Sequence, residues 1–364
     1  MSNYQDKRDA IIIGGGHNGL VCATYLARAG LKVSVLERRE VIGGAAVTEE
    51  FHPGFRNSVA AYTVSLLQPK VIEDLDLHAH GLRIVERKLG NFLPLPDGRS
   101  LRVGAGITRD EVAKFSRRDA ERLADYEHRL EAIADVLRVL AMEPPPNITD
   151  GGWWKAIPEL IRAGKLGKRL HKLDTGLRQE LLDLFTISAA EYLDRWFESE
   201  PIKAVLGFDG IVGNYASPHA PGSAYVLLHH VFGEVNGVKG AWGHAIGGMG
   251  AITQAMAKAA RAAGVDIRTG CGVREVMVEN GRAVGVVTAT SEILQARAIV
   301  ANVNPKLLYE QLLSPLVVPA PTRERMANWR CGSGTFRMNV ALSALPDFSA
   351  LPGPGDHLTA GIIM

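Results

Sequence analysis

The 364-residue chain carries 41 Lys and Arg against 39 Asp and Glu, a net charge of +2. Because the basic excess is so small, nucleic acid is not an expected partner. A hydrophobic content of 46% with 39 glycines is typical of globular proteins and excludes the disordered and fibrous classes.

The cysteines and the N-terminal residues indicate the compartment. Cys22, Cys271 and Cys331 lie far apart and form no CxxC pair, so no disulfide framework is expected and a reducing cytosol fits best. The polar residues Met1–Asp9 precede only a short apolar run, so neither a secretory signal nor a membrane span is predicted. We therefore expect a cytoplasmic protein.

The first predicted elements form a compact βαβ unit. Ala10–Ile13 is wholly apolar and ends at a glycine cluster, which is typical of a parallel strand covered on both faces. His17–Ala29 has apolar residues at helical spacing and stops at Gly30, and Lys32–Glu37 has the composition of a second strand.

The glycines between the first strand and the helix follow the GxGxxG pattern of a dinucleotide site. Gly14 permits the tight turn, Gly16 allows the backbone to approach a pyrophosphate, and Gly19 allows close packing of helix on strand. Glu37 ends the second strand at the distance expected of the acid that binds ribose hydroxyls. Since its carboxylate would repel a 2′-phosphate, an NADP site is not expected.

A second glycine turn indicates which dinucleotide binds. Gly43-Gly44 follows Glu37 in the pattern E-x5-G-G, which an ordinary nicotinamide domain does not require. In these motifs the chain resembles the FAD-dependent amine oxidase and phytoene desaturase superfamily. Five further segments resemble its phytoene-dehydrogenase-related branch: Phe51–Phe55, Asp209–Gly213, Ser217–Gly222, Leu227–His230 and Gly247–Gly250.

The resemblance implies an α/β fold, with a Rossmann-type FAD-binding domain and an inserted mixed α+β substrate domain. It also implies that backbone at Val273 contacts the adenine and that backbone near Asn302 approaches the cofactor. The residues expected to bind FAD are Gly14, Gly15, Gly16, Asn18, Gly19, Glu37, Arg38, Gly43, Gly44, Ala45, Val273 and Asn302.

Members of this family carry another glycine-containing FAD motif near their C-terminus, and this sequence shows no counterpart. We therefore expect a truncated product in which the flavin site and the substrate cavity are incomplete and ADP binding is less affected. The expected domains are 1–105 and 241–310 for FAD, 106–240 for a largely helical insert, and 311–364 for the start of a further substrate segment.

The remaining elements follow from periodicity and turn residues. Helices are predicted within Thr108–Met142 and Trp153–Phe197, and over Ala251–Ala263. Phe208–Gly250 is rich in Gly, Pro, His and Tyr, so irregular backbone near a site is expected there. Four later strands are predicted, the middle two joined at Asn280-Gly281: Val265–Arg268, Val273–Glu279, Ala283–Thr288 and Ile293–Val300.

Candidate catalytic residues lie in the glycine-rich middle segment. Tyr225, His229 and His230 are candidates because an imidazole can move a proton near neutral pH. The alternative is that at least one histidine is only packed or exposed, since neighbours diverge by about 100° on a helix. No His or Cys spacing typical of a zinc site surrounds them, so no metal is expected.

Residues 155–172 combine basic and apolar side chains at helical spacing. Two interpretations stay open: a helix that lies on a membrane surface, and a solvated helix that covers the insert.

These patterns predict an FAD-dependent oxidoreductase that passes a hydride from a substrate C–H bond to noncovalent flavin, by dehydrogenation or desaturation of a small apolar molecule. An NAD-dependent dehydrogenase is one alternative, against which Gly43-Gly44 speaks. A non-catalytic dinucleotide-binding interaction or regulatory protein is the other. The oligomeric state does not follow from the sequence.

Overall fold

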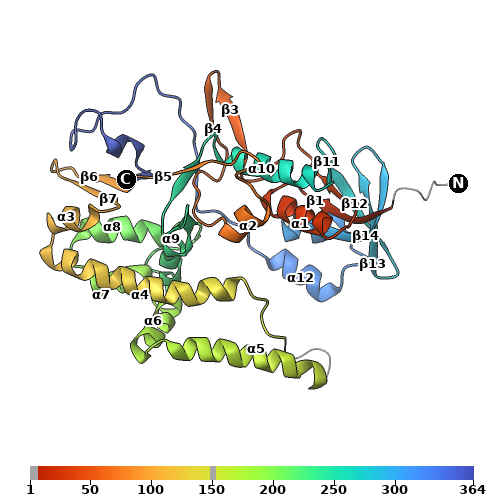
Figure 1. The fold of residues 1–364 in the computed structure, drawn as a ribbon, viewed down its shortest axis with the longest axis horizontal. Helices are drawn as coiled ribbons and strands as arrows, with labels where there is room; N and C mark the ends of the chain where they lie inside the picture. Colours follow the sequence, from red (N-terminus) through yellow and green to blue (C-terminus); the bar gives the residue numbers. More distant parts are fainter. Residues whose placement is uncertain (1–6, 148–152) are drawn as a thin grey trace. The chain divides into compact units, whose positions relative to one another are not determined.

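A computed structural model describes residues 7–147 and 153–364, and the other residues lie outside it. The chain divides into two compact units, each built from separated segments (Figure 1). Unit 1 comprises Met1–Val85, Gly243–Gly332 and Arg337–Ala341. Unit 2 comprises Glu86–Trp242, Ser333–Phe336 and Leu342–Met364.

Unit 1 contains a six-stranded sheet. In spatial order its strands are β11 (Asp266–Arg268), β2 (Val33–Leu36), β1 (Arg8–Ile13), β14 (Ile293–Ala301), β13 (Arg282–Thr288) and β12 (Val273–Glu279). The first four are parallel, and the last three form an antiparallel meander that shares β14 with them. This is the parallel arrangement expected of a Rossmann-type domain, with an antiparallel extension at one edge.

Alternate residues of β1 pack on opposite faces of this sheet. Ile12 is fully buried beside apolar residues of α1 (His17–Arg28) and α10 (Met249–Ala262). Ile11 and Ile13 face the other side, where they pack against apolar side chains of β12, β13 and β14. Because both faces are covered, the strand has to be apolar throughout, as its sequence is.

The other elements of unit 1 are short. A hairpin joins β3 (Thr48–His52) to β4 (Phe55–Ser58), and β5 (Ile84–Glu86) pairs with β10 (Gly243–Ala245). The helices are α2 (Pro69–Asp74), α11 (Pro305–Leu307) with the π-helical turn η3 (Leu308–Leu312), and α12 (Ala320–Asn328).

Unit 2 combines a small sheet with a helical array. The sheet order is β15-β6-β7, with bounds Ile362–Ile363, Leu89–Pro94 and Ser100–Gly104, and β8 (Glu234–Val235) and β9 (Val238–Lys239) form a separate hairpin. The helices are α3 (Thr108–Ala113), α4 (Arg117–Ala141), α5 (Trp153–Lys172), α6 (Thr175–Thr186), α7 (Ala189–Trp196), α8 (Glu200–Asp209) and α9 (His229–Phe232), with the 3-10 helix η2 (Ala224–Leu228) and another, η4 (Asp356–Thr359).

The core of unit 2 lies between the middle helices and the sheet. Tyr126 of α4 lies edge-on to Trp196 and Phe197, and Tyr192 of α7 is almost fully buried. Ser116 is the N-cap of helix α4, and its hydroxyl accepts from the backbone N–H of Asp119. Serine and aspartate at N-caps favour a helix start, which explains why the predicted helical stretches divide at such residues.

Most predicted elements are confirmed. Each of the four later predicted strands is present within a residue of its predicted bounds, and Asn280 and Gly281 both have positive φ, 50° and 77°, as their turn requires. One prediction is partly wrong: Phe208–Gly250 is less irregular than expected. Helix α8 runs through Asp209, and η2, α9 and three short strands follow it. The predicted functional domains at 1–105, 106–240, 241–310 and 311–364 stay a proposal.

Within the described residues, no helix combines the length and hydrophobicity needed to cross a bilayer.

Candidate dinucleotide-binding site

The turn after β1 brings backbone atoms closer than any side chain would allow. Gly14 has a φ of 104°, and its N–H donates to the carbonyl oxygen of Leu36 at 2.8 Å. A Cβ at Gly19 would lie 2.3 Å from the oxygen of Gly14, and one at Gly14 would lie 2.6 Å from the oxygen of Asn302. Glycine is therefore required by space at both positions, and at Gly14 by conformation as well.

Glu37 closes this turn from the adjacent strand. Its side chain is 7% exposed, and Oε2 accepts a 2.8 Å hydrogen bond from the backbone N–H of Gly15. Oε1 accepts from the N–H of Arg39 at 2.9 Å. Because each carboxylate oxygen has a second lone pair, the anchored group can still accept hydrogen bonds from ribose hydroxyls.

The second glycine turn lies directly against the first. The N–H of Gly43 donates to the oxygen of Gly15 at 2.9 Å, and Gly16 forms a parallel β-bridge with Gly43. Gly44 has a φ of 58°, and a Cβ there would lie 3.2 Å from the Cα of Gly16. Two segments that the sequence separates thus form one continuous backbone cradle.

The start of α1 offers unsatisfied donors to an anion. Its N-cap is Gly16, no side chain caps it, and no acidic residue stands in its first turn. The free N–H groups and the helix dipole therefore suit a phosphate. Asn18 is exposed in this first turn, and Gly44 and Ala45 are exposed in the facing turn. These residues fit the ADP half of a dinucleotide.

Asn302 holds the glycine turn from behind. Its backbone N–H donates to the oxygen of Ile13 at 2.9 Å, and its side-chain Nδ2 donates to the oxygen of Gly14 at 3.3 Å. The expected role of this position was a backbone approach to the cofactor. The structure shows a side-chain hydrogen bond that positions Gly14, and the backbone approach to the cofactor stays a prediction.

The segment before β12 lies at the end of β2. The N–H of Cys271 donates to the oxygen of Glu37 at 2.8 Å, and that of Gly270 donates to the oxygen of Arg39 at 2.9 Å. These bonds bring the segment that leads into β12, whose first residue is the half-buried Val273, beside the exposed Arg38 at the carboxyl end of β2. Their contact with an adenine stays a prediction.

Sequence reasoning missed three hydroxyl groups that join the first part of α10 to the second turn and to the hairpin that follows it. Thr253 in α10 donates to the oxygen of Ala46 at 3.0 Å, while Thr48 and Ser58 accept from the N–H groups of Gly250 and Met249 at 2.9 and 3.0 Å. No short motif marks these residues, since their partners lie some 200 positions away.

The catalytic candidates lie in unit 2, whereas every candidate FAD-binding residue lies in unit 1. Tyr225 is exposed on η2 and stacks on Phe185, with ring centroids 5.8 Å apart. His229 begins α9, its ring centroid lies 5.8 Å from that of Trp242, and burial lowers its pKa. His230 follows on α9, and its side chain lies outside the described part.

The part of the chain that the structure describes contains no group of three His, Cys, Asp or Glu side chains placed to bind a metal. Its cysteines are free thiols, with Cys22 and Cys271 half-buried and Cys331 exposed.

Several known proteins are similar to this chain. Pyridine nucleotide-disulfide oxidoreductase domain-containing protein 2 of Rattus norvegicus is 39% identical over 363 residues, which cover 96% of this chain and 62% of that protein. A subunit of the limonene dehydrogenase of Castellaniella defragrans is 26% identical, with 94% and 61% covered. The zeta-carotene-forming phytoene desaturase of Myxococcus xanthus is 28% identical, with 90% and 59% covered. The chain thus spans about 60% of the length of these relatives.

The fold also matches that of solved structures. An oxidoreductase from Methanosarcina mazei has a TM-score of 0.56 at 16% identity, over 88% of this chain and 65% of that one. The model of the family described as flavin containing amine oxidoreductase matches residues 19–335. These findings confirm the predicted family, the predicted fold class and FAD as the cofactor. The chain belongs to the flavin-containing amine oxidoreductases.

Proposed function

We propose that this protein is an FAD-dependent oxidoreductase that holds FAD noncovalently and removes a hydride from a C–H bond of a small apolar substrate. The observation that carries the proposal is the buried carboxylate of Glu37 joined to the glycine turn through the N–H of Gly15. When bound, the isoalloxazine ring of FAD supplies the hydride acceptor.

The residues of unit 1 divide the work of binding. Glu37 accepts hydrogen bonds from the ribose hydroxyls, and the N–H groups at the start of α1 face the pyrophosphate. Gly43 and Gly44 keep a second stretch of backbone free of side chains beside the first turn. The NAD-dependent alternative loses its support because the family uses flavin.

Two observations support an apolar substrate. One relative is named for limonene and another for zeta-carotene formation from phytoene, and these are hydrocarbons.

Tyr225, His229 and His230 are the proposed catalytic residues of unit 2. Burial lowers the pKa of His229, which favours the neutral imidazole, the form that can accept a proton. A cytoplasmic location and a peripheral membrane contact through residues 155–172 are further parts of this proposal.

The visible absorption spectrum of the purified, desalted chain tests cofactor binding. We expect a flavin spectrum that denaturation releases, or one that returns when FAD is added to colourless protein. A colourless protein that does not take up FAD contradicts the proposal.

Catalysis is tested separately, by anaerobic mixing of the FAD complex with a panel of branched and unsaturated hydrocarbons. Loss of the flavin absorption band supports dehydrogenation. Bound FAD that stays oxidised across the panel favours the alternative of a nucleotide-binding protein without catalysis.

A further inference from the structure

Helix α5 presents apolar side chains to solvent along one side. Trp154 is 69% exposed, and Leu160 and Ile161 are each 56% exposed, with Ile157 between them on the same face. Their spacing of three, four and seven residues places all four within one stripe of the helix. Large apolar side chains that gather on one exposed face of a soluble protein mark an interaction surface.

The opposite side of α5 makes the contacts with the rest of unit 2. Leu166 and Leu170 are half-buried there, and Arg169 pairs with Glu143 at 2.9 Å. No described residue of α5 is fully buried, and the first buried side chain beyond it is Leu173. The apolar stripe is therefore additional to the side that packs on the protein.

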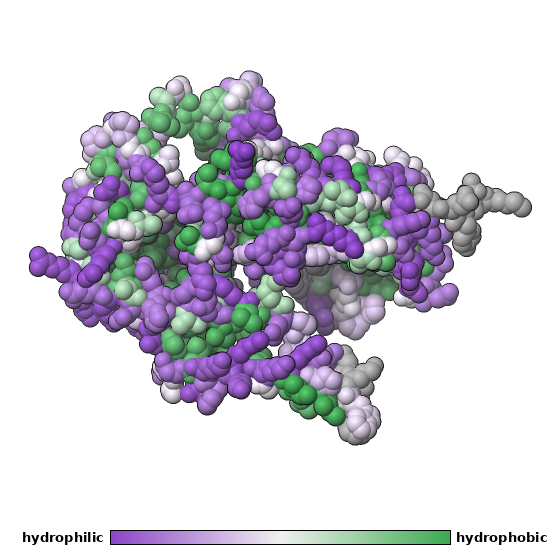
Figure 2. Space-filling model, in the orientation of Figure 1, coloured by the Kyte–Doolittle hydropathy of each residue, from purple (hydrophilic) through white to green (hydrophobic). Residues whose placement is uncertain are grey.

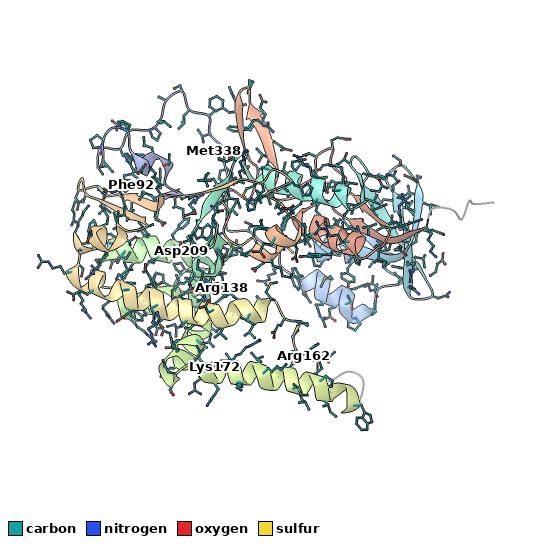
Figure 3. The ribbon with its side chains drawn as sticks, viewed as in Figure 1. Phe92, Arg138, Arg162, Lys172, Asp209 and Met338 are labelled. Carbon is teal, nitrogen blue, oxygen red and sulfur yellow. The ribbon has the colours of Figure 1, made fainter. Side chains whose placement is uncertain are left out.

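Three lysines continue the stripe toward the C-terminal end of the helix. Lys165, Lys168 and Lys172 are all exposed, and none of them forms an ion pair among the described residues, whereas Arg162 pairs with Glu159 and Arg169 with Glu143. Figure 2 shows hydrophobic residues gathered at one end of α5 and hydrophilic ones along the rest, and Figure 3 labels Arg162 and Lys172 on it. We call these seven residues the α5 outer face: Trp154, Ile157, Leu160, Ile161, Lys165, Lys168 and Lys172.

We propose that the α5 outer face docks on an anionic lipid bilayer, with the helix parallel to the surface. The apolar stripe enters the boundary between headgroups and acyl chains, where tryptophan is favoured. The lysines keep their stems along the lipid and their ammonium groups among anionic headgroups.

A bilayer fits this surface better than a second copy of the chain. A symmetric, antiparallel contact through this face would place the lysines of one molecule against the apolar stripe of the other, where their ammonium groups would be buried without anionic partners. The inference gives the proposed membrane contact of residues 155–172 a specific surface and lipid, and it does not depend on the proposed oxidoreductase activity.

Flotation of the purified full chain with vesicles tests the docking. We expect binding to phosphatidylcholine vesicles that contain phosphatidylserine, weaker binding to phosphatidylcholine alone, and loss of binding in high salt. Reversing the three lysines to glutamate is expected to weaken the binding about tenfold or more, since each contributes to attraction by the anionic surface. The matched control reverses three exposed lysines of unit 1, Lys7, Lys32 and Lys258, and is expected to bind like the parent chain.

A second variant separates apolar insertion from charge. Leu160→Ser with Ile161→Ser keeps every charge and is expected to abolish the blue shift of tryptophan emission on anionic vesicles, as is Trp154→Phe. Far-ultraviolet circular dichroism and FAD uptake check that the variants fold. Equal binding of the parent chain to neutral and anionic vesicles, or equal loss in the lysine variant and its control, overturns the proposal. The proposal is also overturned if light scattering shows a dimer of the parent chain, the serine variant dissociates that dimer, and the parent chain does not bind vesicles.

Discussion

The backbone N–H of Gly15 donates a 2.8 Å hydrogen bond to Oε2 of Glu37, across the end of two neighbouring parallel strands. The second oxygen of the same carboxylate accepts from the N–H of Arg39. Glu37 therefore does two things at once: it fixes the glycine turn and presents an anionic acceptor at the carboxyl end of β2. Charge-assisted hydrogen bonds of this kind are the stronger ones in proteins.

Replacing Glu37 by alanine is expected to weaken FAD binding. The ribose loses a charge-assisted hydrogen bond worth roughly 1.5–3 kcal/mol, which corresponds to about a tenfold to hundredfold rise in Kd. Titration with FAD, followed by flavin fluorescence, measures the change. Glu275→Ala is the control, because that glutamate is exposed on β12 of the same unit. An unchanged Kd in Glu37→Ala contradicts the ribose assignment.

Gly19→Ala is expected to destabilise unit 1 by about 1–3 kcal/mol, the usual cost of an overpacked site. The added Cβ would lie 2.3 Å from the backbone oxygen of Gly14, which cannot move without opening the turn. Urea unfolding measures the loss. Gly164→Ala is the matched control: nothing lies within 4 Å of its Cβ position on α5, so stability there should rise by up to about 1 kcal/mol. Equal changes in the free energy of unfolding for the two variants would rule out the steric argument.

Asn302 is expected to tolerate alanine better than aspartate. Alanine removes the hydrogen bond to the oxygen of Gly14, at a cost of about 1 kcal/mol. Aspartate has the same shape but turns a donor into an anion that faces this oxygen and lies near the proposed pyrophosphate. FAD titrations of Asn302→Ala and Asn302→Asp compare the two, and tighter binding by the aspartate variant would contradict the placement.

The buried carboxylate of Glu180 in unit 2 depends on its partners. It accepts a 2.5 Å hydrogen bond from the hydroxyl of Tyr192 and pairs with Arg129. Arg129→Met leaves this charge without its cation and is expected to cost about 3–5 kcal/mol. Arg195→Met removes exposed ion pairs and should cost at most about 1 kcal/mol. Denaturant unfolding of both variants distinguishes these values, and equal losses would contradict the burial argument.

Asp209 lies at the end of α8 (Figure 3), and its burial is expected to make the free energy of unfolding depend on pH. Burial raises its pKa well above the ordinary value of 3.8. A carboxyl group whose folded pKa is raised binds its proton more tightly in the folded state, so the stability it contributes is present at low pH and is lost as the pH rises. Asp209→Asn should therefore be more stable than the parent chain at neutral pH and should lose that advantage near pH 4. Denaturant unfolding of the variant and of the parent chain, at neutral pH and near pH 4, tests the sign of this difference in stability.

Some of this protein could be predicted from the sequence because the information is local. The strand Ala10–Ile13, the glycines that follow it and Glu37 lie within one βαβ unit, and each residue type there has a backbone or charge reason. The E-x5-G-G pattern also identified the turn at Gly43 that the structure places against Gly16. Hydrophobic periodicity predicted most helices and the later strands for the same reason.

Other features were decided only by tertiary structure. Asn302 reaches Gly14 because β14 pairs with β1, and Thr253 reaches Ala46 because α10 packs beside the second turn. Such contacts join residues hundreds of positions apart, and single polar residues carry no periodic signal that would reveal them. The sequence likewise showed that 155–172 is amphipathic, but not which side of the helix the protein covers. Packing of Leu166 and Leu170 toward unit 2 left Trp154, Leu160 and Ile161 in solvent, because a helix can bury only the face that meets its neighbours.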